Sequence, residues 1–188
     1  NAYAKIALDN MDDFYFPTRG TRTDAEFTLN TEFSNDDHTH SPSFLFRMEN
    51  VIPVFPRTTM LFNIYSRSLF NDNFPQFKTT FVGGASYAQY FNHHLPFLGL
   101  PPVTIAKRYT NIGLAGVRLQ ILENHYISLI YNIMLQENDW SEIKNLDPIN
   151  GGGIKYAVKT PIGPFEIGFG YASNHEKLTF SANLGLWF

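Results

Sequence analysis

Two groups of residues in this 188-residue sequence resemble reactive sites, and the first contains a possible nucleophile. Gly84-Ala85-Ser86-Tyr87-Ala88 nearly matches the G-x-S-x-G elbow of serine hydrolases, with alanine in place of the last glycine. That elbow needs a strand–turn–helix context and a downstream acid and histidine. We find no helical period in the chain, so we predict that this chain has no catalytic residue.

The second group consists of donors of the kind that bind metals. His38 and His40 lie beside Asp36 and Asp37, and a second histidine pair follows at 93–94. Imidazole and carboxylate groups ligate zinc, but a structural site needs four fixed ligands. We predict that the first cluster is a solvated loop and that the second pair packs or hydrogen-bonds. We therefore expect no metal and no cofactor.

Composition limits the class of protein. The chain fits a single domain, residues 1–188, and its net charge of −3 argues against a nucleic-acid partner. Cysteine is absent, and the apolar runs are far shorter than the roughly 18 residues of a transmembrane helix. Aromatic residues make up 16%, including 18 Phe, although the mean hydropathy is only −0.19. So many rings are typical of the aromatic girdles of a membrane β-barrel.

Strict alternation of apolar and polar residues is the main structural signal. Over residues 21–33 the odd positions are Thr, Ala, Phe and Leu, while most even positions are charged or amide. A period of two indicates a strand with two different faces. A soluble sandwich would turn the apolar face inward, whereas a barrel turns it to lipid. At about 13 residues the segment is longer than usual strands and suits a tilted membrane crossing.

Ten segments alternate in this way, and the connections between them are short and long in turn. The predicted strands are 2–9, 21–33, 44–49, 60–67, 79–84, 111–122, 126–135, 152–160, 163–173 and 178–188. Short turns and long loops in alternation are typical of outer-membrane barrels. The predicted lumen-facing charges, which we interpret as structural, are Arg22, Glu26, Arg47, Glu49, Arg67 and Arg118.

Four motifs resemble the BamA-type outer-membrane assembly barrels, also known as bacterial surface antigen barrels. They are LDNMDDFYFPTRGTRTDAEF, FVGGASYAQYF, TPIGPFEIGFGYA and ANLGLWF, in the family's order over nearly the whole chain. The resemblance implies an all-β, antiparallel transmembrane barrel of about sixteen strands, in the outer membrane of a Gram-negative bacterium. This chain would supply about the last ten strands, with a loop folded into the lumen after Gly83-Gly84.

The resemblance also explains why the chain stops on an apolar alternating strand. In this class such a strand is the signal read by the barrel assembly machinery, and here its residues would be Asn183, Gly185, Leu186 and Phe188. The C-terminus would then be periplasmic. We expect that the first and last strands, 2–9 and 178–188, do not pair, and that further strands complete the barrel.

The insertase branch of this family carries Val-Arg-Gly-Phe in its lumenal loop, and the arginine meets a wall aspartate. Here the arginine position is Gln89, the phenylalanine is Phe91, and the aspartate position is Asn132. A buried ion pair that loses both charges need not be destabilised. We therefore predict that Gln89 and Asn132 lie close together in the lumen as a neutral pair.

Two classes of function stay open. This combination, with NHHLPFLGL at 92–100, resembles barrels fused behind patatin-like phospholipase domains, which implies an anchor for a lipid hydrolase outside this chain. The alternative is an assembly or translocation barrel of the BamA or TamA type, and a soluble all-β binding module is a remote third. Expected partners are outer-membrane lipids, the assembly machinery and other outer-membrane proteins.

Overall fold

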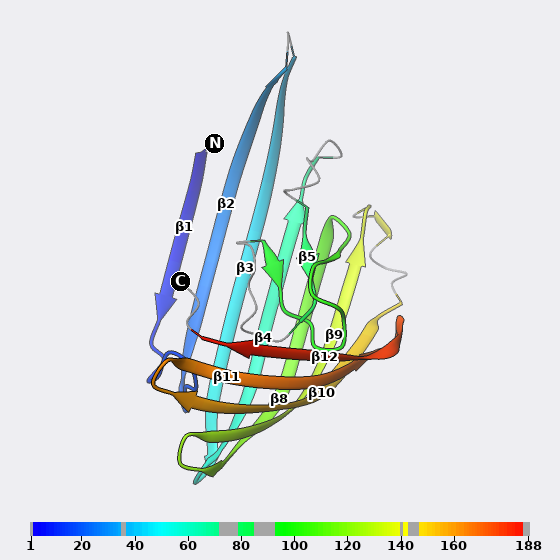
Figure 1. Ribbon diagram of the computed structural model, residues 1–188. Coiled ribbons are helices and arrows are strands. Elements are labelled where there is room, and N and C mark those ends of the chain that lie inside the picture. The colour runs from blue at the N-terminus through cyan, green and yellow to red at the C-terminus, as the bar shows by residue number, and fades with distance from the viewer. Residues whose placement is uncertain are drawn as a thin grey trace.

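Nine strands form one antiparallel sheet in the computed structural model (Figure 1). The structure describes residues 2–34, 37–71, 79–84, 93–139, 141–142 and 147–185, and no side chains over 32–39. The sheet strands, in spatial order, are β1 (Ala2–Asp9), β2 (Gly20–Ser34), β3 (Asp37–Phe55), β4 (Thr58–Leu69), β8 (Tyr109–Leu122), β9 (His125–Glu137), β10 (Ile149–Thr160), β11 (Gly163–Ala172) and β12 (His175–Leu184). Each strand pairs with its neighbour in sequence, except across the segment between β4 and β8. This is the all-β antiparallel architecture that the alternation predicted.

The prediction of a wall strand over 79–84 is wrong. That segment leaves the wall and contributes β5 (Phe81–Val82) to a separate three-stranded sheet, together with β6 (His94–Leu95) and β7 (Thr104–Ile105). Gly83 and Gly84 both have positive φ, which ends the strand after two residues. The chain therefore supplies nine wall strands among its described residues, where ten were expected.

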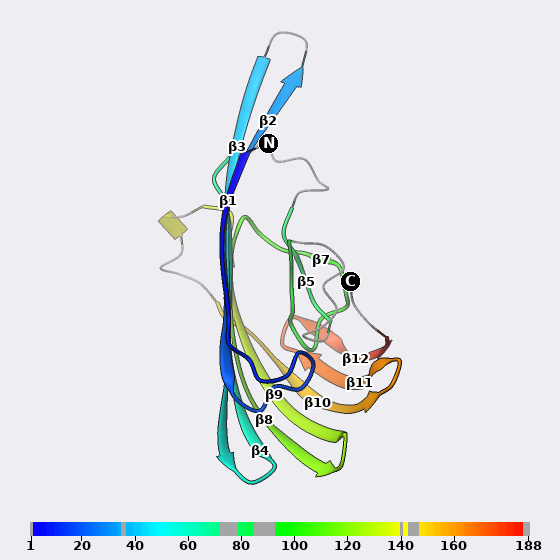
Figure 2. The same cartoon turned by 90° about the vertical axis from the view of Figure 1, so that its left-hand side faces the viewer.

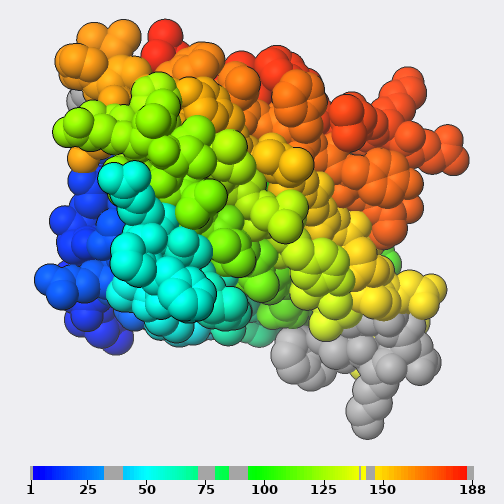
Figure 3. Space-filling model, turned by 90° about the horizontal axis from the view of Figure 1, so that it is seen from below, coloured from blue at the N-terminus to red at the C-terminus, as the bar shows by residue number. Residues whose placement is uncertain are grey.

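The predicted parity of the wall strands is correct. On β9, Ile127, Leu129 and Tyr131 are exposed on the convex face, whereas the alternate residues Ser128, Ile130 and Asn132 are buried on the concave face. The same alternation places exposed apolar side chains along the neighbouring strands. Figure 3 shows the atoms of β4, β8, β9 and β10 forming a continuous convex surface. Exposed apolar side chains over a whole sheet face suit lipid rather than water.

The connections differ in length at the two ends of the wall. At one end, which we name the short-turn end, residues 56–57, 123–124 and 161–162 make three tight turns, and residues 10–19 link β1 to β2. The other end, the long-loop end, carries the two longest connections, which join β4 to β8 and β9 to β10. Its other two connections, between β2 and β3 and between β11 and β12, are as short as the tight turns. The loop expected between the predicted strands 21–33 and 44–49, which was to include His38 and His40, is mostly strand, because β2 and β3 continue to pair up to Ser34 and Asp37. Polar residues there therefore did not mark the end of pairing, and two of them, Ser41 and Ser43, are buried on β3.

The sheet is curved but not closed. Figure 2 shows the wall bending around the small sheet, which lies on its concave side. Among the described residues, β1 pairs only with β2 and β12 only with β11. No helix in this part of the chain is both long and apolar enough to cross a membrane.

Candidate functional site

The concave face of the wall holds a folded loop between β4 and β8. In the described part of this loop, β5 pairs in parallel with β6 and antiparallel with β7, and a bridge joins Gly84 to Phe97. The lumenal loop expected after Gly83-Gly84 is therefore present. The segment 93–101, which follows β5, makes the closest contacts with the wall, and we name it the inner segment.

Apolar packing fixes the inner segment to the wall. Leu95, Phe97 and Leu100 share one buried cluster with Tyr65 of β4 and Met134 of β9. Each of these side chains is at most 3% exposed. A buried aromatic or aliphatic side chain contributes on the order of 1.5–3 kcal/mol relative to an exposed one. Side chains of a loop usually face water, but those of the inner segment are part of the main apolar core.

Glycines on β10 and β11 let the loop backbone approach the wall. A Cβ atom on Gly151 would lie 2.5 Å from Cε1 of Phe97 and 2.8 Å from the Leu98 carbonyl oxygen. A Cβ atom on Gly170 would lie 2.7 Å from the amide nitrogen of Gly99. Real Cβ contacts are not this short, so any other residue would push the loop away. The glycines thus form a floor on which the inner segment lies.

Asn132 connects this floor to the loop by a hydrogen bond. Its side chain is fully buried on the concave face of β9, opposite Gly151, and its Nδ2 donates to the Leu98 carbonyl at 2.9 Å. Its Oδ1 meets no donor within the part of the chain that the structure describes. Gln89 and Phe91 lie outside the described residues, so their predicted proximity to Asn132 stays a prediction. Asn132 itself contacts the inner segment, through a backbone carbonyl.

Two of the predicted lumen-facing arginines also hold the loop. Arg67 of β4 donates to the carbonyls of Thr79 and His93 at 3.3 and 3.2 Å, and Arg47 of β3 donates to the carbonyl of His94 at 3.4 Å. Arg67 is only 6% exposed, so these contacts are shielded from water. Charge-assisted bonds to carbonyls satisfy a buried guanidinium that would otherwise be costly. These arginines are structural, as predicted, and their role is to position the loop.

The histidines of the inner segment pack inside the lumen, as predicted. The His93 ring lies 5.5 Å from the ring of Phe81, and His94 is fully buried. In the other group, His40 pairs with the Thr31 hydroxyl at 3.1 Å, whereas the side chains of Asp36, Asp37 and His38 lie outside the described residues. Ser86 also lies outside them.

A buried ion pair on the concave face escaped the sequence analysis. Lys155 of β10 and Glu166 of β11 are 3.1 Å apart, and both side chains are at most 6% exposed. The distance is that of an ion pair, and the carboxylate oxygens of Glu166 make no hydrogen bond within the described residues. Parity was the available signal, because Lys155 has the parity of Gly151 and Glu166 has that of Gly170, so all four lie on the concave face. The wall therefore keeps a charge pair of its own beside the loop.

The predicted assembly signal is described only in part. Asn183 faces inward on β12, in register with Glu166. The strand ends at Leu184, and Gly185 has a φ of +118° while its N–H donates to the Pro164 carbonyl at 3.1 Å. Leu186 and Phe188 lie outside the described residues. The role of these four positions as a signal stays a prediction.

A lipid-suited convex face, a polar and partly glycine-lined concave face, and a loop folded inside define an integral outer-membrane β-barrel. A family model described as the OMP85 superfamily matches residues 1–188. The chain belongs to this superfamily and is an integral protein of the Gram-negative outer membrane. A search of curated proteins found no match.

Proposed function

We propose that this barrel is an outer-membrane anchor for an enzymatic domain outside the chain, a patatin-like lipid hydrolase. The observation that carries the proposal is the neutral contact between Asn132 and the Leu98 carbonyl. At this wall position the insertase barrels that the sequence resembles have an aspartate for the loop arginine. A barrel with an amide there lacks the charge on which that latch depends.

The way the loop is held also favours a static role. The glycine floor, the apolar cluster around Phe97 and the arginine contacts act together on one short segment. Closely packed interfaces do not deform continuously. Moving the segment would therefore require many contacts to break at once. An anchor tolerates such a fixed plug, whereas a translocation pore has to displace it.

We further propose that the short-turn end faces the periplasm. Outer-membrane barrels place tight turns on that side and long loops outside. The C-terminus, which follows β12 towards the short-turn end, is then periplasmic. The convex apolar face contacts outer-membrane lipids, and the assembly machinery is the partner during insertion. Other outer-membrane proteins in a complex are further candidate partners.

The test is deletion of the gene for the whole protein in its native bacterium. We expect loss of acyl-hydrolase activity from the outer-membrane fraction, while the amounts of other folded outer-membrane barrels stay unchanged. Supplying the barrel alone should restore neither activity nor any other function. If other barrels instead fail to assemble and hydrolase activity persists, the anchor proposal is wrong.

The second candidate is an assembly or translocation barrel of the BamA or TamA type. Membership of the OMP85 superfamily favours it. The deletion experiment separates the two, because only an assembly barrel makes the folding of other barrels depend on it.

A further inference from the structure

The connection between β1 and β2 is far more elaborate than a chain reversal requires. Residues 10–19 form it, and we name this segment the strap. The other three connections at the short-turn end need only two residues each. Figure 2 shows the strap leaving the wall and reaching into the concave side.

The strap has its own internal framework of hydrogen bonds. The Asp12 carboxylate accepts bonds from the backbone N–H of Thr18 at 2.7 Å and of Arg19 at 3.2 Å, and from the Thr18 hydroxyl. Asp13 accepts bonds from the N–H groups of Tyr15 and Phe16 at 2.9 and 3.0 Å. Such side-chain-to-backbone bonds fix a turn in one conformation. The strap is therefore a preformed element.

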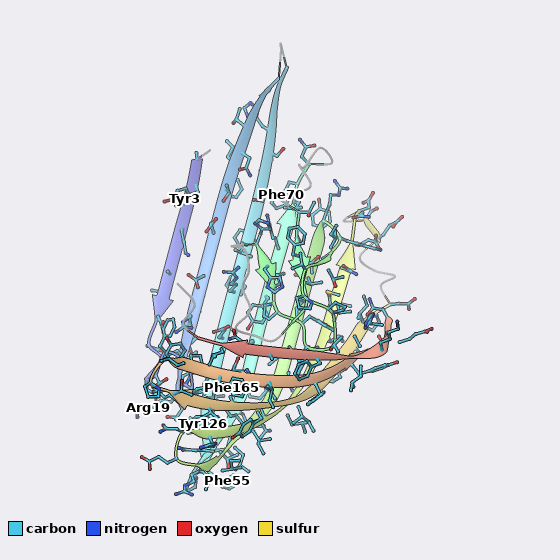
Figure 4. All side chains as sticks on the ribbon, viewed as in Figure 1. Tyr3, Arg19, Phe55, Phe70, Tyr126 and Phe165 are labelled. Atoms are coloured by element: carbon cyan, nitrogen blue, oxygen red, sulfur yellow. The ribbon has the colours of Figure 1, made fainter. Side chains whose placement is uncertain are left out.

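Three contacts attach the strap to strands on the opposite side of the lumen. The Phe16 ring stacks on Tyr126 of β9, with centroids 4.4 Å apart and planes at 19°. Arg118 of β8 donates to the Pro17 carbonyl and lies over the same Tyr126 ring at 5.8 Å. Lys159 of β10 pairs with the Asp13 carboxylate at 2.5 Å. Figure 4 shows Arg19 and Tyr126, which it labels, at the same end of the molecule.

These contacts join parts of the wall that are distant along the sheet. Between β2 and β10 lie β3, β4, β8 and β9. Five interstrand steps of about 4.8 Å amount to roughly 24 Å along the curved wall. The strap leaves β1 and returns to the adjacent β2, so only about half of its extended length, roughly 17 Å, reaches outward. The side chains that meet it from the far strands span the rest of the chord of this arc. The path of the strap therefore runs across the mouth of the lumen.

We propose that the strap is a lid that closes the lumen at the short-turn end, with the Phe16–Tyr126 stack as its seat. Phe16 is only 3% exposed, although it belongs to a connection between strands. Because Phe16 packs on a distant strand of the wall, the same contact closes the mouth of the lumen and depends on the curvature of the sheet. This inference does not depend on which domain the barrel anchors.

Accessibility of a residue behind the lid tests this proposal in the whole protein. Ser128 lies two residues beyond Tyr126 on the concave face of β9 and is 2% exposed. Ser128→Cys introduces a thiol into a chain without cysteine, and cysteines elsewhere in the protein are replaced by serine. Labelling is measured with a membrane-impermeant maleimide on the purified, detergent-solubilised protein. We expect Phe16→Ala to raise the labelling rate at least about tenfold. Loss of a buried, stacked ring should shift the equilibrium between the closed and open strap by more than a factor of ten.

Phe14→Ala is the matched control, because Phe14 is on the same strap but 62% exposed. It should leave the labelling rate unchanged. Gel mobility before and after heating shows whether each variant is folded. If folded Phe16→Ala is labelled at the same rate as Phe14→Ala, the strap is not a lid.

Reversing the charges of Asp13 and Lys159 gives a second test, which does not depend on the stack of Phe16 on Tyr126. Asp13→Lys and Lys159→Asp should each raise the labelling rate about two- to fivefold, as an exposed ion pair allows. The double variant should be labelled more slowly than Asp13→Lys alone, although the N–H groups of Tyr15 and Phe16 stay without the Asp13 acceptor. Equal rates in the two single variants, the double variant and the native protein would also overturn the proposal.

Discussion

A methyl group added to the glycine floor is predicted to lift the inner segment off the wall. In Gly151→Ala the new Cβ atom would lie 2.5 Å from Cε1 of Phe97 and 2.8 Å from the Leu98 carbonyl oxygen. Comfortable contacts begin near 3.4 Å, so the loop must retreat by about 0.6–0.9 Å. The Leu98 contact is with backbone and cannot be relieved by rotating a side chain.

Overpacking of this kind costs about 1–3 kcal/mol. We expect the loss to appear as a lower urea midpoint with an unchanged slope, and as faster hydrogen exchange in the amides of the inner segment, 93–101. The exchange measurement is decisive, because it locates the change at the loop rather than in the whole barrel.

Gly113→Ala is the matched control, since it makes the same change on β8. A Cβ there would meet only a side-chain atom, Cγ2 of Ile133, at 3.4 Å. We expect this variant to stay within about 0.5 kcal/mol of the native protein. If Gly151→Ala and Gly113→Ala have the same stability and the same exchange in the inner segment, the close approach does not hold the loop.

Three further predictions concern polar contacts. Asn132→Leu should lower stability by about 1–3 kcal/mol and speed exchange in the inner segment, because the carbonyl that it binds is left buried without a donor. Lys155→Met should cost about 3–5 kcal/mol in urea unfolding by leaving the Glu166 charge unpaired, whereas adding Glu166→Leu should recover most of the loss. Partial burial raises the pKa of Asp13, but hydrogen bonds from Lys159 and two backbone N–H groups outweigh it and lower the pKa below the ordinary 3.8. The stabilisation from Asp13 is therefore present above pH 3.8 and lost as the pH falls through the lowered pKa, so exchange in the strap should rise as the pH falls below 3.8. Asp13→Asn should abolish this pH step.

The faces of the strands could be predicted from the sequence alone. With a period of two, each side chain points to one of only two faces, and the face that carries the charged residues cannot contact lipid. The alternation therefore predicted that Arg67 points inward and Leu129 outward, as the structure has them. The motifs around Gly83-Gly84 likewise indicated a loop inside the barrel. Both inferences rest on local rules that act between neighbouring residues or on short motifs.

The contacts between segments distant in sequence could not be predicted in this way. The contacts of Asn132 with Leu98 and of Phe16 with Tyr126 depend on how far the sheet curves, which no local pattern encodes. Curvature results from twist summed over many strands, so small local differences determine what lies opposite. The same reason explains why a segment predicted as a wall strand, 79–84, belongs to the loop instead. Its alternation was genuine, but the partner that it pairs with lies inside the lumen.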